Sequence, residues 1–172
     1  MEVLRTDRLV LRWLSVDDAA FIHELVNDPD WLRYIGDRGV RTLDDARNYL
    51  LAGPIAMYAR LGFGLYRVEL RESGAPIGIC GLIKRDSLDD VDVGFAFLPR
   101  FRSLGYAYEA AAATLEYGRR TFGLARIVAI VSPDNRPSIR LLEKLGLALE
   151  RSIQLAPEAE EVYLFGPASP PA

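Results

Sequence analysis

Residues 90–131 constrain the fold of this 172-residue chain more than any other segment. A strand signal over Asp90–Leu98 runs through a short loop into an alanine-rich helix from Gly105 to about Phe122. The apolar, β-branched run Ile127–Val131 follows, and it is typical of a fully buried strand. Two strands joined by one helix are expected to lie parallel in one sheet, with the helix covering one of its faces.

Further signals on both sides complete the order of elements. Strands are predicted at residues 9–13, 63–71, 77–84, 149–155 and 161–165, and helices at residues 15–27, 42–51 and 137–145. Capping-box pairs, Ser15 with Asp18 and Thr42 with Asp45, open the first two helices. The order β-α-α-β-β-β-α-β-α-β-β predicts an α/β fold in which helices cover the faces of a mixed sheet.

The chain shows no internal repeat and no Pro/Gly/Ser-rich linker. We therefore predict a single domain over residues 1–166, followed by a flexible proline-rich tail at residues 167–172. Because 21 basic and 24 acidic residues give a net charge of -3, the composition argues against non-specific nucleic-acid binding. No apolar run approaches the ~20 residues of a membrane span, and the N-terminus lacks the apolar segment of a signal peptide. A cytoplasmic location is expected.

Cys80 and His23 are the only residues of their kinds. A single cysteine excludes an intrachain disulfide, and one cysteine with one histidine leaves almost no room for a Cys/His metal site. Hydrolases of the Ser-His-Asp or Cys-His type depend on a histidine base, so a lone histidine argues against them as well.

Residues 102–107, RSLGYA, lie where a strand ends and a helix begins. Free N–H groups and the positive end of the helix dipole attract phosphate at such a position. Gly105 lets the main chain turn tightly, and Arg102 can add a charge-assisted hydrogen bond. Neither GxxxxGK[ST] nor GxGxxG occurs, which argues against a P-loop and against a dinucleotide-binding oxidoreductase. Taken alone, this segment is equally consistent with an ordinary capped start of a helix.

A second polar block, SPDNRPS at residues 132–138, follows the buried strand. Asn135 and Ser138 fall between the end of that strand and the start of the next helix. Because ligands gather at the carboxyl ends of parallel strands, this block and residues 102–107 are expected at the same edge of the sheet. The alternative is that Asn135 is a helix cap and Ser138 a first-turn residue.

Four blocks in this order resemble the acetyl-CoA-dependent N-acetyltransferases of the GNAT superfamily. Within it the chain is most similar to the RimJ/RimL-type branch, bacterial enzymes that acetylate the N-termini of ribosomal proteins. The resemblance covers residues 4–165, and its blocks are TDRLVLRWLSVDDA at 6–19, IGICGL at 77–82, VDVGFAFLPRFRSLGYAYEA at 91–110 and SPDNRPSIRLLEKLGL at 132–147.

The resemblance implies that the strand ending near Leu98 splays from the strand ending near Val131, with acetyl-CoA in the V between them. The backbone of Phe97 and Leu98 would pair with the pantetheine arm as an added strand does. Asn135 and Ser138 would contact the cofactor on the pantetheine side. The pyrophosphate would be held by the N–H groups of Arg102, Ser103, Leu104, Gly105, Tyr106 and Ala107. No metal is implied.

The family moves an acetyl group from the thioester to a primary amine, here a protein N-terminus or a small molecule. Asp92 is the first candidate for the base that deprotonates the amine, because it lies early on the strand that leads to the cofactor loop, where the family often carries an acidic residue, and Gly94 and Ala96 leave room on its side of the strand. The other interpretation is a solvated aspartate at the start of a strand, in a run that also contains Asp86, Asp89 and Asp90. The alternative bases are Glu158, Glu160 and Glu161. A backbone N–H near Leu98 is expected to stabilise the oxyanion, and Ser138 is expected to protonate the leaving thiolate.

The chain departs from the family at four positions. Leu142 stands where many relatives carry a tyrosine that donates a proton to the leaving thiolate. Tyr108 stands where a residue with a small hydroxyl side chain is usual. Ser103 and Leu104 replace a glycine and a basic residue beside the phosphates. These changes leave open a second interpretation, a non-catalytic acyl-CoA-binding sensor on the same fold.

The acceptor amine is expected to enter from the opposite side of the V. Asp28-Pro29 ends the first predicted helix. A loop over residues 28–41 follows, and it and the last hairpin would form the walls. Trp31 and Tyr34 are the candidate lining residues, although aromatic side chains at such places often simply pack down. The protein is expected to be a monomer or a homodimer.

Overall fold

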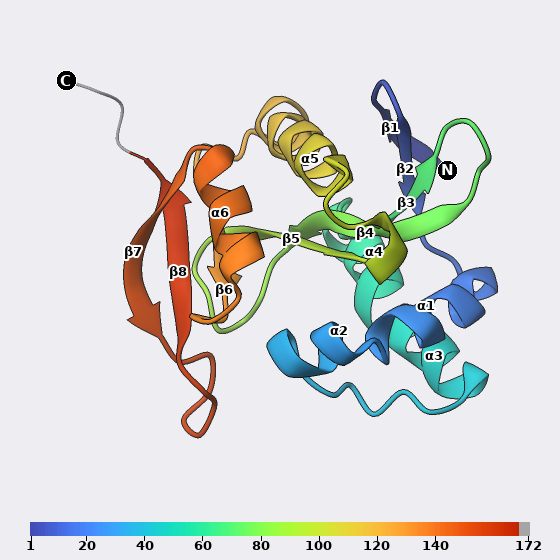
Figure 1. The fold of residues 1–172 in the computed structure, drawn as a ribbon, viewed down its shortest axis with the longest axis horizontal. Coiled ribbons are helices and arrows are strands. Elements are labelled where there is room, and N and C mark those ends of the chain that lie inside the picture. Colours follow the sequence, from blue (N-terminus) through green and yellow to red (C-terminus); the bar gives the residue numbers. More distant parts are fainter. Residues whose placement is uncertain (169–172) are drawn as a thin grey trace.

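An eight-stranded mixed sheet in the order β1-β2-β3-β4-β5-β6-β8-β7 runs through the computed structural model, which describes residues 1–168 (Figure 1). The strands are β1 (Glu2–Arg5), β2 (Leu9–Trp13), β3 (Leu65–Leu70), β4 (Pro76–Ile83), β5 (Val91–Phe97), β6 (Ile127–Val131), β7 (Leu147–Ile153) and β8 (Val162–Pro167). Neighbouring strands are antiparallel except β5 and β6, which are parallel. The predicted mixed α/β sheet and its parallel pair are confirmed.

Helices cover both faces of this sheet (Figure 1). The helical segments are η1 (Val16–Asp18), α1 (Ala19–Val26), α2 (Pro29–Tyr34), α3 (Leu43–Leu50), the π-helical η2 (Leu51–Ile55), α4 (Ala56–Leu61), η3 (Pro99–Phe101), α5 (Tyr106–Phe122) and α6 (Arg136–Lys144). On one face, the small residues Ala110 and Ala111 let α5 approach β4 and β5 closely. On the other face, Ile22 of α1 and Leu50 of α3 pack with Ile79 of β4.

The two predicted capping boxes are confirmed. The Ser15 backbone N–H donates to the Asp18 carboxylate at 2.9 Å, and the Thr42 hydroxyl accepts from the Asp45 N–H at 3.0 Å. The first box opens the short η1, and α1 begins at Ala19, a few residues later than predicted.

Three elements differ from the sequence prediction. The loop predicted at residues 28–41 contains α2, because Pro29 occupies the first helical position and the Asp28 side chain caps the Asp30 N–H at 3.2 Å. The Asp-Pro pair therefore starts a helix as well as following one. β1 and α4 were not predicted: β1 is a short edge strand paired only with β2, and α4 continues α3 through the π-helical turn at Gly53-Pro54.

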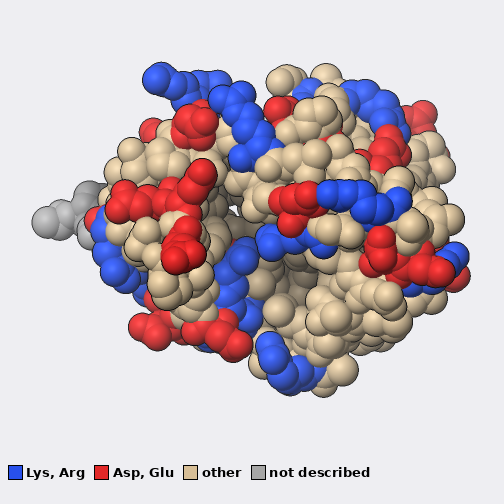
Figure 2. Space-filling view, turned by 90° about the horizontal axis from the view of Figure 1, so that it is seen from below, with Lys and Arg blue, Asp and Glu red and all other residues tan. Residues whose placement is uncertain are grey.

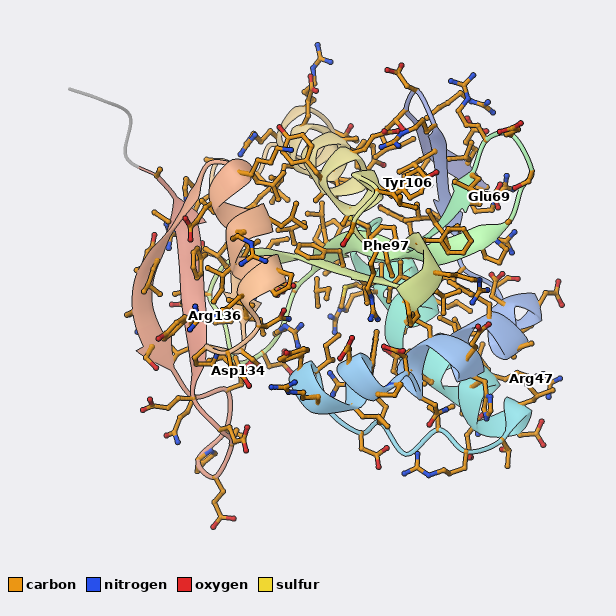
Figure 3. The ribbon with its side chains drawn as sticks, in the orientation of Figure 1. Arg47, Glu69, Phe97, Tyr106, Asp134 and Arg136 are labelled. Carbon is orange, nitrogen blue, oxygen red and sulfur yellow. The ribbon has the colours of Figure 1, made fainter. Side chains whose placement is uncertain are left out.

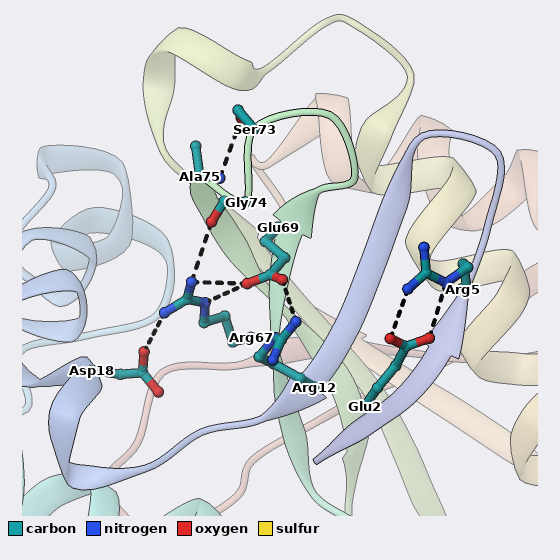
Figure 4. A network of polar contacts seen from close by, with 9 residues as sticks. All are labelled: Glu2, Arg5, Arg12, Asp18, Arg67, Glu69, Ser73, Gly74 and Ala75. Carbon is teal, nitrogen blue, oxygen red and sulfur yellow. Dashed lines mark hydrogen bonds and ion pairs between the residues drawn. The ribbon is translucent and has the colours of Figure 1, made fainter.

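A polar network fastens the first helices to the sheet (Figure 4). Arg67 on β3 donates to Asp18 at 2.7 Å and to Glu69 at 2.9 Å, and Arg12 on β2 donates to Glu69 at 2.5 Å. Glu69 is only 5% exposed, so its charge depends on these two guanidinium groups. Asp18 both caps η1 and pairs with the sheet, which fixes the position of the helices that follow it.

β5 and β6 separate soon after they meet. Their pairing consists of Val91 with Ile127 and Asp92 with Val128, although β5 continues to Phe97. From Ala129 onward β6 pairs with β8 on its other side. This confirms the predicted divergence of the two strands, and it leaves one edge of β5 facing a V-shaped gap.

The sheet continues into the predicted tail. Pro167 is the last residue of β8, and the Ala168 N–H donates to the Gly146 carbonyl at 2.9 Å. The rest of the predicted tail, residues 169–172, lies outside the described residues.

Candidate active site

Alternation along β5 decides which backbone groups face the V. The Leu98 N–H donates to the Ile77 carbonyl of β4 at 2.9 Å, and the Leu98 carbonyl accepts from Phe101 at 3.0 Å. In an antiparallel pair every second residue points its N–H away from the partner strand, so Phe95 and Phe97 point theirs toward the V. Leu98 is therefore not free for the cofactor or oxyanion role expected of it, whereas the N–H groups of Phe95 and Phe97 are available on the side of the V.

The loop after β5 presents a row of backbone donors. The helical hydrogen bonds of α5 begin at Glu109, whose N–H donates to the Gly105 carbonyl at 3.1 Å. Among residues 1–168 no backbone acceptor serves the N–H groups of residues 103–108. Ser103 and Gly105 hold positive φ angles of 62° and 86°. Free N–H groups at the start of a helix, here one of 17 residues, are the kind of feature to which anions bind.

The turn between β1 and β2 supports this loop from behind. The Arg8 side chain donates to Glu109 at 2.8 Å and to the Leu104 carbonyl at 3.0 Å. It also lies over the ring of Tyr106 at 4.4 Å; Tyr106 is labelled in Figure 3. The Thr6 hydroxyl donates to Glu109 at 2.5 Å. Burial alone would raise the pKa of Glu109, but these hydrogen bonds outweigh it and hold the pKa below its ordinary value.

The Arg102 side chain is engaged by acceptors of the protein itself. Its guanidinium donates to the Phe97 carbonyl at 2.9 Å, to Asp28 at 2.6 Å and to Asp30 at 2.6 Å. The structure therefore places this charge on the start of α2, where it links the loop after β5 to the helix that borders the V. No sequence pattern indicates this link, because it joins segments about 70 residues apart.

Two cavities meet in the V. The loop cavity, about 500 Å³, is bordered by the loop after β5, the start of α5 and the face of α6 that carries Ser138, Arg140 and Lys144. The Asp92 cavity, about 330 Å³, is bordered by Asp92, the end of α6 and the helices α2–α4. Figure 2 shows a hollow between the C-terminal strands and the rest of the molecule, with basic side chains at its rim. Both cavities share Trp31, Tyr34, Ile35, Phe95, Ala96, Asn135 and Ser138.

Asp92 is the carboxylate inside this arrangement. It is 1% exposed, and Arg85 donates to its Oδ1 at 3.0 Å. Burial raises the pKa of Asp92 above its ordinary value, and the positive charge of Arg85 opposes that rise. The alternative bases Glu158, Glu160 and Glu161 are exposed and border neither cavity.

The start of α6 brings Asn135 and Ser138 together at the junction of the cavities. Asn135 is the helix cap, and its side-chain oxygen accepts from the Ser138 N–H at 3.4 Å. No hydrogen bond of the Ser138 hydroxyl is formed within residues 1–168. Leu142, one turn further, is 1% exposed and borders the Asp92 cavity. The capping role considered from the sequence is thus present, and it places Ser138 at the V.

α2 spans the open end of the V. The Ser132 hydroxyl donates to the Tyr34 carbonyl at 3.0 Å, and Arg33 lies 3.3 Å from the Asp134 carboxylate beyond β6. Trp31 is 5% exposed and packs with the core beneath α2, yet it borders both cavities, as does the half-buried Tyr34. Trp31 and Tyr34 thus both border the V, and their contact with an acceptor stays a prediction.

The Asp92 cavity is also bordered by three residues that no sequence pattern singled out. Arg38 comes from the segment after α2, Tyr49 from α3 and Arg85 from the segment after β4. Burial raises the pKa of Tyr49, and the positive charges of Arg38 and Arg85 act against that rise. No local pattern marks these residues, because only packing of three separate elements brings them together.

This geometry defines a class of protein. A strand edge with free N–H groups, an anion-binding loop at its end and a buried carboxylate in an adjoining cavity suit a transferase with an extended, phosphate-bearing donor and a small acceptor. In residues 1–168 there is no cluster of three or more His, Cys, Asp or Glu placed to bind a metal ion, and no helix long and apolar enough to cross a bilayer.

Comparison with known proteins identifies the family. Residues 8–148 match the family described as acetyltransferase (GNAT) domain. The uncharacterised N-acetyltransferase YnaD of Bacillus subtilis is 31% identical over 147 residues, which is 86% of this chain and 83% of YnaD. A GNAT-family acetyltransferase from Bacillus anthracis superposes with a TM-score of 0.77 at 30% identity, covering 96% of this chain and 97% of that one.

The ribosomal α-N-protein acetyltransferase RimL, solved in complex with coenzyme A, shares the fold with a TM-score of 0.83 at 16% identity over 98% of each chain. The chain belongs to the GNAT acetyltransferase family and is an acetyl-CoA-dependent acetyltransferase. The resemblance drawn from the four sequence blocks is thereby confirmed.

Proposed function

We propose that this protein transfers the acetyl group of acetyl-CoA to a primary amine, which is either a protein N-terminal α-amine or the amine of a small molecule. The observation that supports it best is the free edge of β5, which runs from a buried carboxylate at Asp92 to the anion-binding loop at residues 103–108. Acetyl-CoA supplies the activated thioester, and the protein supplies the positions of the two reactants.

The residues at the V fit acetyl-CoA. The N–H groups of Phe95 and Phe97 can pair with the amide-bearing pantetheine arm as a neighbouring strand would. The pyrophosphate matches the donors of residues 103–108, which have no acceptor of their own among the described residues. Asn135 and Ser138 border the same space from α6. The loop cavity therefore holds the donor, and the Asp92 cavity is left for the acceptor.

Asp92 is proposed to take the proton of the incoming amine. An ammonium has no lone pair, and the α-amino pKa of about 7.7–8.0 makes a base useful at neutral pH. Burial raises the pKa of Asp92 and so increases its basicity, while Arg85 keeps the carboxylate paired. Ser138, whose hydroxyl is uncommitted at the junction of the cavities, is proposed to donate a proton to the departing thiolate.

Two measurements test this function. Coenzyme A should raise the thermal unfolding temperature, and some member of a panel of amines and peptides should accelerate the release of free thiol from acetyl-CoA. Asp92→Asn and Ser138→Ala should each slow turnover, whereas the exposed neighbours Asp89→Asn and Ser87→Ala should not. Turnover that survives both site variants unchanged would remove these two role assignments.

A protein that binds coenzyme A but acetylates no amine in the panel would instead support the non-catalytic sensor. No feature of the site favours that interpretation over transfer. The cytoplasmic location and the monomeric or homodimeric state stay predictions from the sequence.

A further inference from the structure

We propose that the acceptor carries a carboxylate as well as its amine, as a free amino acid does, and that Arg38 and Arg85 bind this carboxylate in the Asp92 cavity. The inference rests on the proposed function, because it takes that cavity as the acceptor's place. It limits the acceptor to amines that carry a carboxylate, and it assigns recognition of that carboxylate to Arg38 and Arg85.

The charge of the Asp92 cavity is the first argument. Of all its lining residues only Arg38, Arg85 and Asp92 are charged. Arg85 and Asp92 neutralise each other as an ion pair at 3.0 Å, so the positive charge of Arg38 is left over. A primary amine is itself positive in solution at neutral pH. A cavity with excess positive charge disfavours such a ligand unless the ligand brings a negative group of its own.

Arg85 has donors to spare. Its Nε is bonded to Asp92, and its guanidinium makes no other hydrogen bond or ion pair within residues 1–168. A guanidinium carries five N–H donors in a planar fork that matches a carboxylate, so most of this fork stays available. The side chain is 28% exposed, which leaves it accessible from the cavity.

Arg38 is free of any partner in the described part of the chain, although its neighbours in sequence are not. Asp37, the adjacent residue in the sequence, pairs with Arg41 at 2.5 Å instead. Arg38 and Arg85 come from different segments, and both border the Asp92 cavity together with Tyr49. Two guanidinium groups and a phenol therefore line the same cavity, and these are the kinds of donor that bind a carboxylate.

The rest of the lining fits a small molecule with an apolar side chain. Trp31, Met57, Leu155 and Val162 supply aromatic and aliphatic surface, and the volume of about 330 Å³ lies at the lower end for ligand pockets. Asp92 on one side would face the amine, and the two arginines would face the carboxylate. A peptide N-terminus carries an amide in place of the carboxylate, so it lacks the negative charge that the two arginines would bind.

The test compares matched acceptors that differ only in the carboxylate. Leucine, leucinamide and 3-methylbutylamine form one set, and phenylalanine, phenylalaninamide and 2-phenylethylamine form another. A peptide with N-terminal leucine represents the protein alternative. The kcat/KM of each is measured with acetyl-CoA for the wild type and Arg38→Gln. Arg119→Gln is the matched control, because Arg119 is exposed on the far part of α5 and borders neither cavity.

The wild type should use the better amino acid at least about tenfold more efficiently than its amide, as expected for a charge-assisted contact. Arg38→Gln should lower kcat/KM for the amino acid by about the same factor and change kcat/KM for its amide by less than about twofold. Arg119→Gln should change neither value. Equal use of acid and amide by the wild type, preference for the peptide, or equal losses for acid and amide in Arg38→Gln would overturn the inference.

Binding separates this inference from the proposed function. Calorimetric titration of the same amino acids is carried out on the wild type and Arg38→Gln with coenzyme A present. Binding that needs Arg38, without transfer to any acceptor, supports the carboxylate site while contradicting the transferase proposal. Transfer to amines without Arg38-dependent binding of the acids keeps the transferase and removes the site.

Discussion

Gly105→Ala tests the loop on which cofactor binding is proposed to depend. At φ of +86°, an L side chain costs about 1–2 kcal/mol, offset by about 0.4–1 kcal/mol because alanine restricts the unfolded chain more than glycine does. The new Cβ would also lie 3.1 Å from an Arg8 guanidinium nitrogen, so Arg8 must shift and weaken its contacts to Leu104 and Glu109. Those contacts add about 1 kcal/mol, for a total near 2 kcal/mol.

Gly74→Ala is the matched control, because Gly74 has φ of +74° and an added Cβ there meets nothing within 4 Å. Its expected loss is about 1 kcal/mol from backbone strain alone. For a chain of this size the unfolding temperature should fall by about 4–8 °C in Gly105→Ala and about 2–4 °C in Gly74→Ala. In calorimetric titration, coenzyme A should bind Gly105→Ala about tenfold more weakly and Gly74→Ala normally. Normal binding by Gly105→Ala would refute the role of the loop.

Three other outcomes are expected. Asp92 must be ionised to act as a base, and its pKa is raised above 3.8, so kcat/KM should fall as the pH drops through that pKa. Asp92→Asn should abolish this acid-side fall in the pH–rate profile. An unchanged acid-side fall in the variant would contradict the role of Asp92 as the base. The pKa of Glu109 is lowered from 4.5, so its ionised form stabilises the fold above pH 4.5 and this stabilisation is lost as the pH falls further. In Glu109→Gln, the unfolding temperature should therefore depend less on pH in the acid range. Arg102→Gln should cost about 1–2 kcal/mol in denaturant unfolding, because Asp28 is nearly buried, and Asp30→Asn, at a half-exposed partner, should cost less than about 1 kcal/mol.

Local hydrogen bonding explains which elements the sequence predicted well. The capping boxes at Ser15 and Thr42 are formed within four residues, so their signature survives in any tertiary context. Pro29 is ambiguous by nature, since proline is compatible with the first turn of a helix and incompatible with the interior of one. β1 carries little pattern of its own, because its pairing with β2 comes from the fold.

The same distinction holds for the site. Residues 102–107 and the pair Asn135 and Ser138 lie in continuous motifs, and the fold brings both motifs to the V as predicted. The choice between Leu98 and Phe95 depends on a one-residue register against β4, which sequence alone does not set. The direction of the Arg102 side chain and the meeting of Arg38 with Arg85 are set by tertiary packing.

The separation of the two cavities has a consequence for how such a protein diverges. The groups proposed to grip the donor come from one stretch of chain between β5 and the start of α6, whereas α2, α3, α4 and the segments beside them form one wall of the Asp92 cavity. Gene copies can accumulate changes in the second set and explore new acceptors while the first set is inherited intact. For the engineer, Tyr49, Met57 and Leu155 are accordingly the places to randomise.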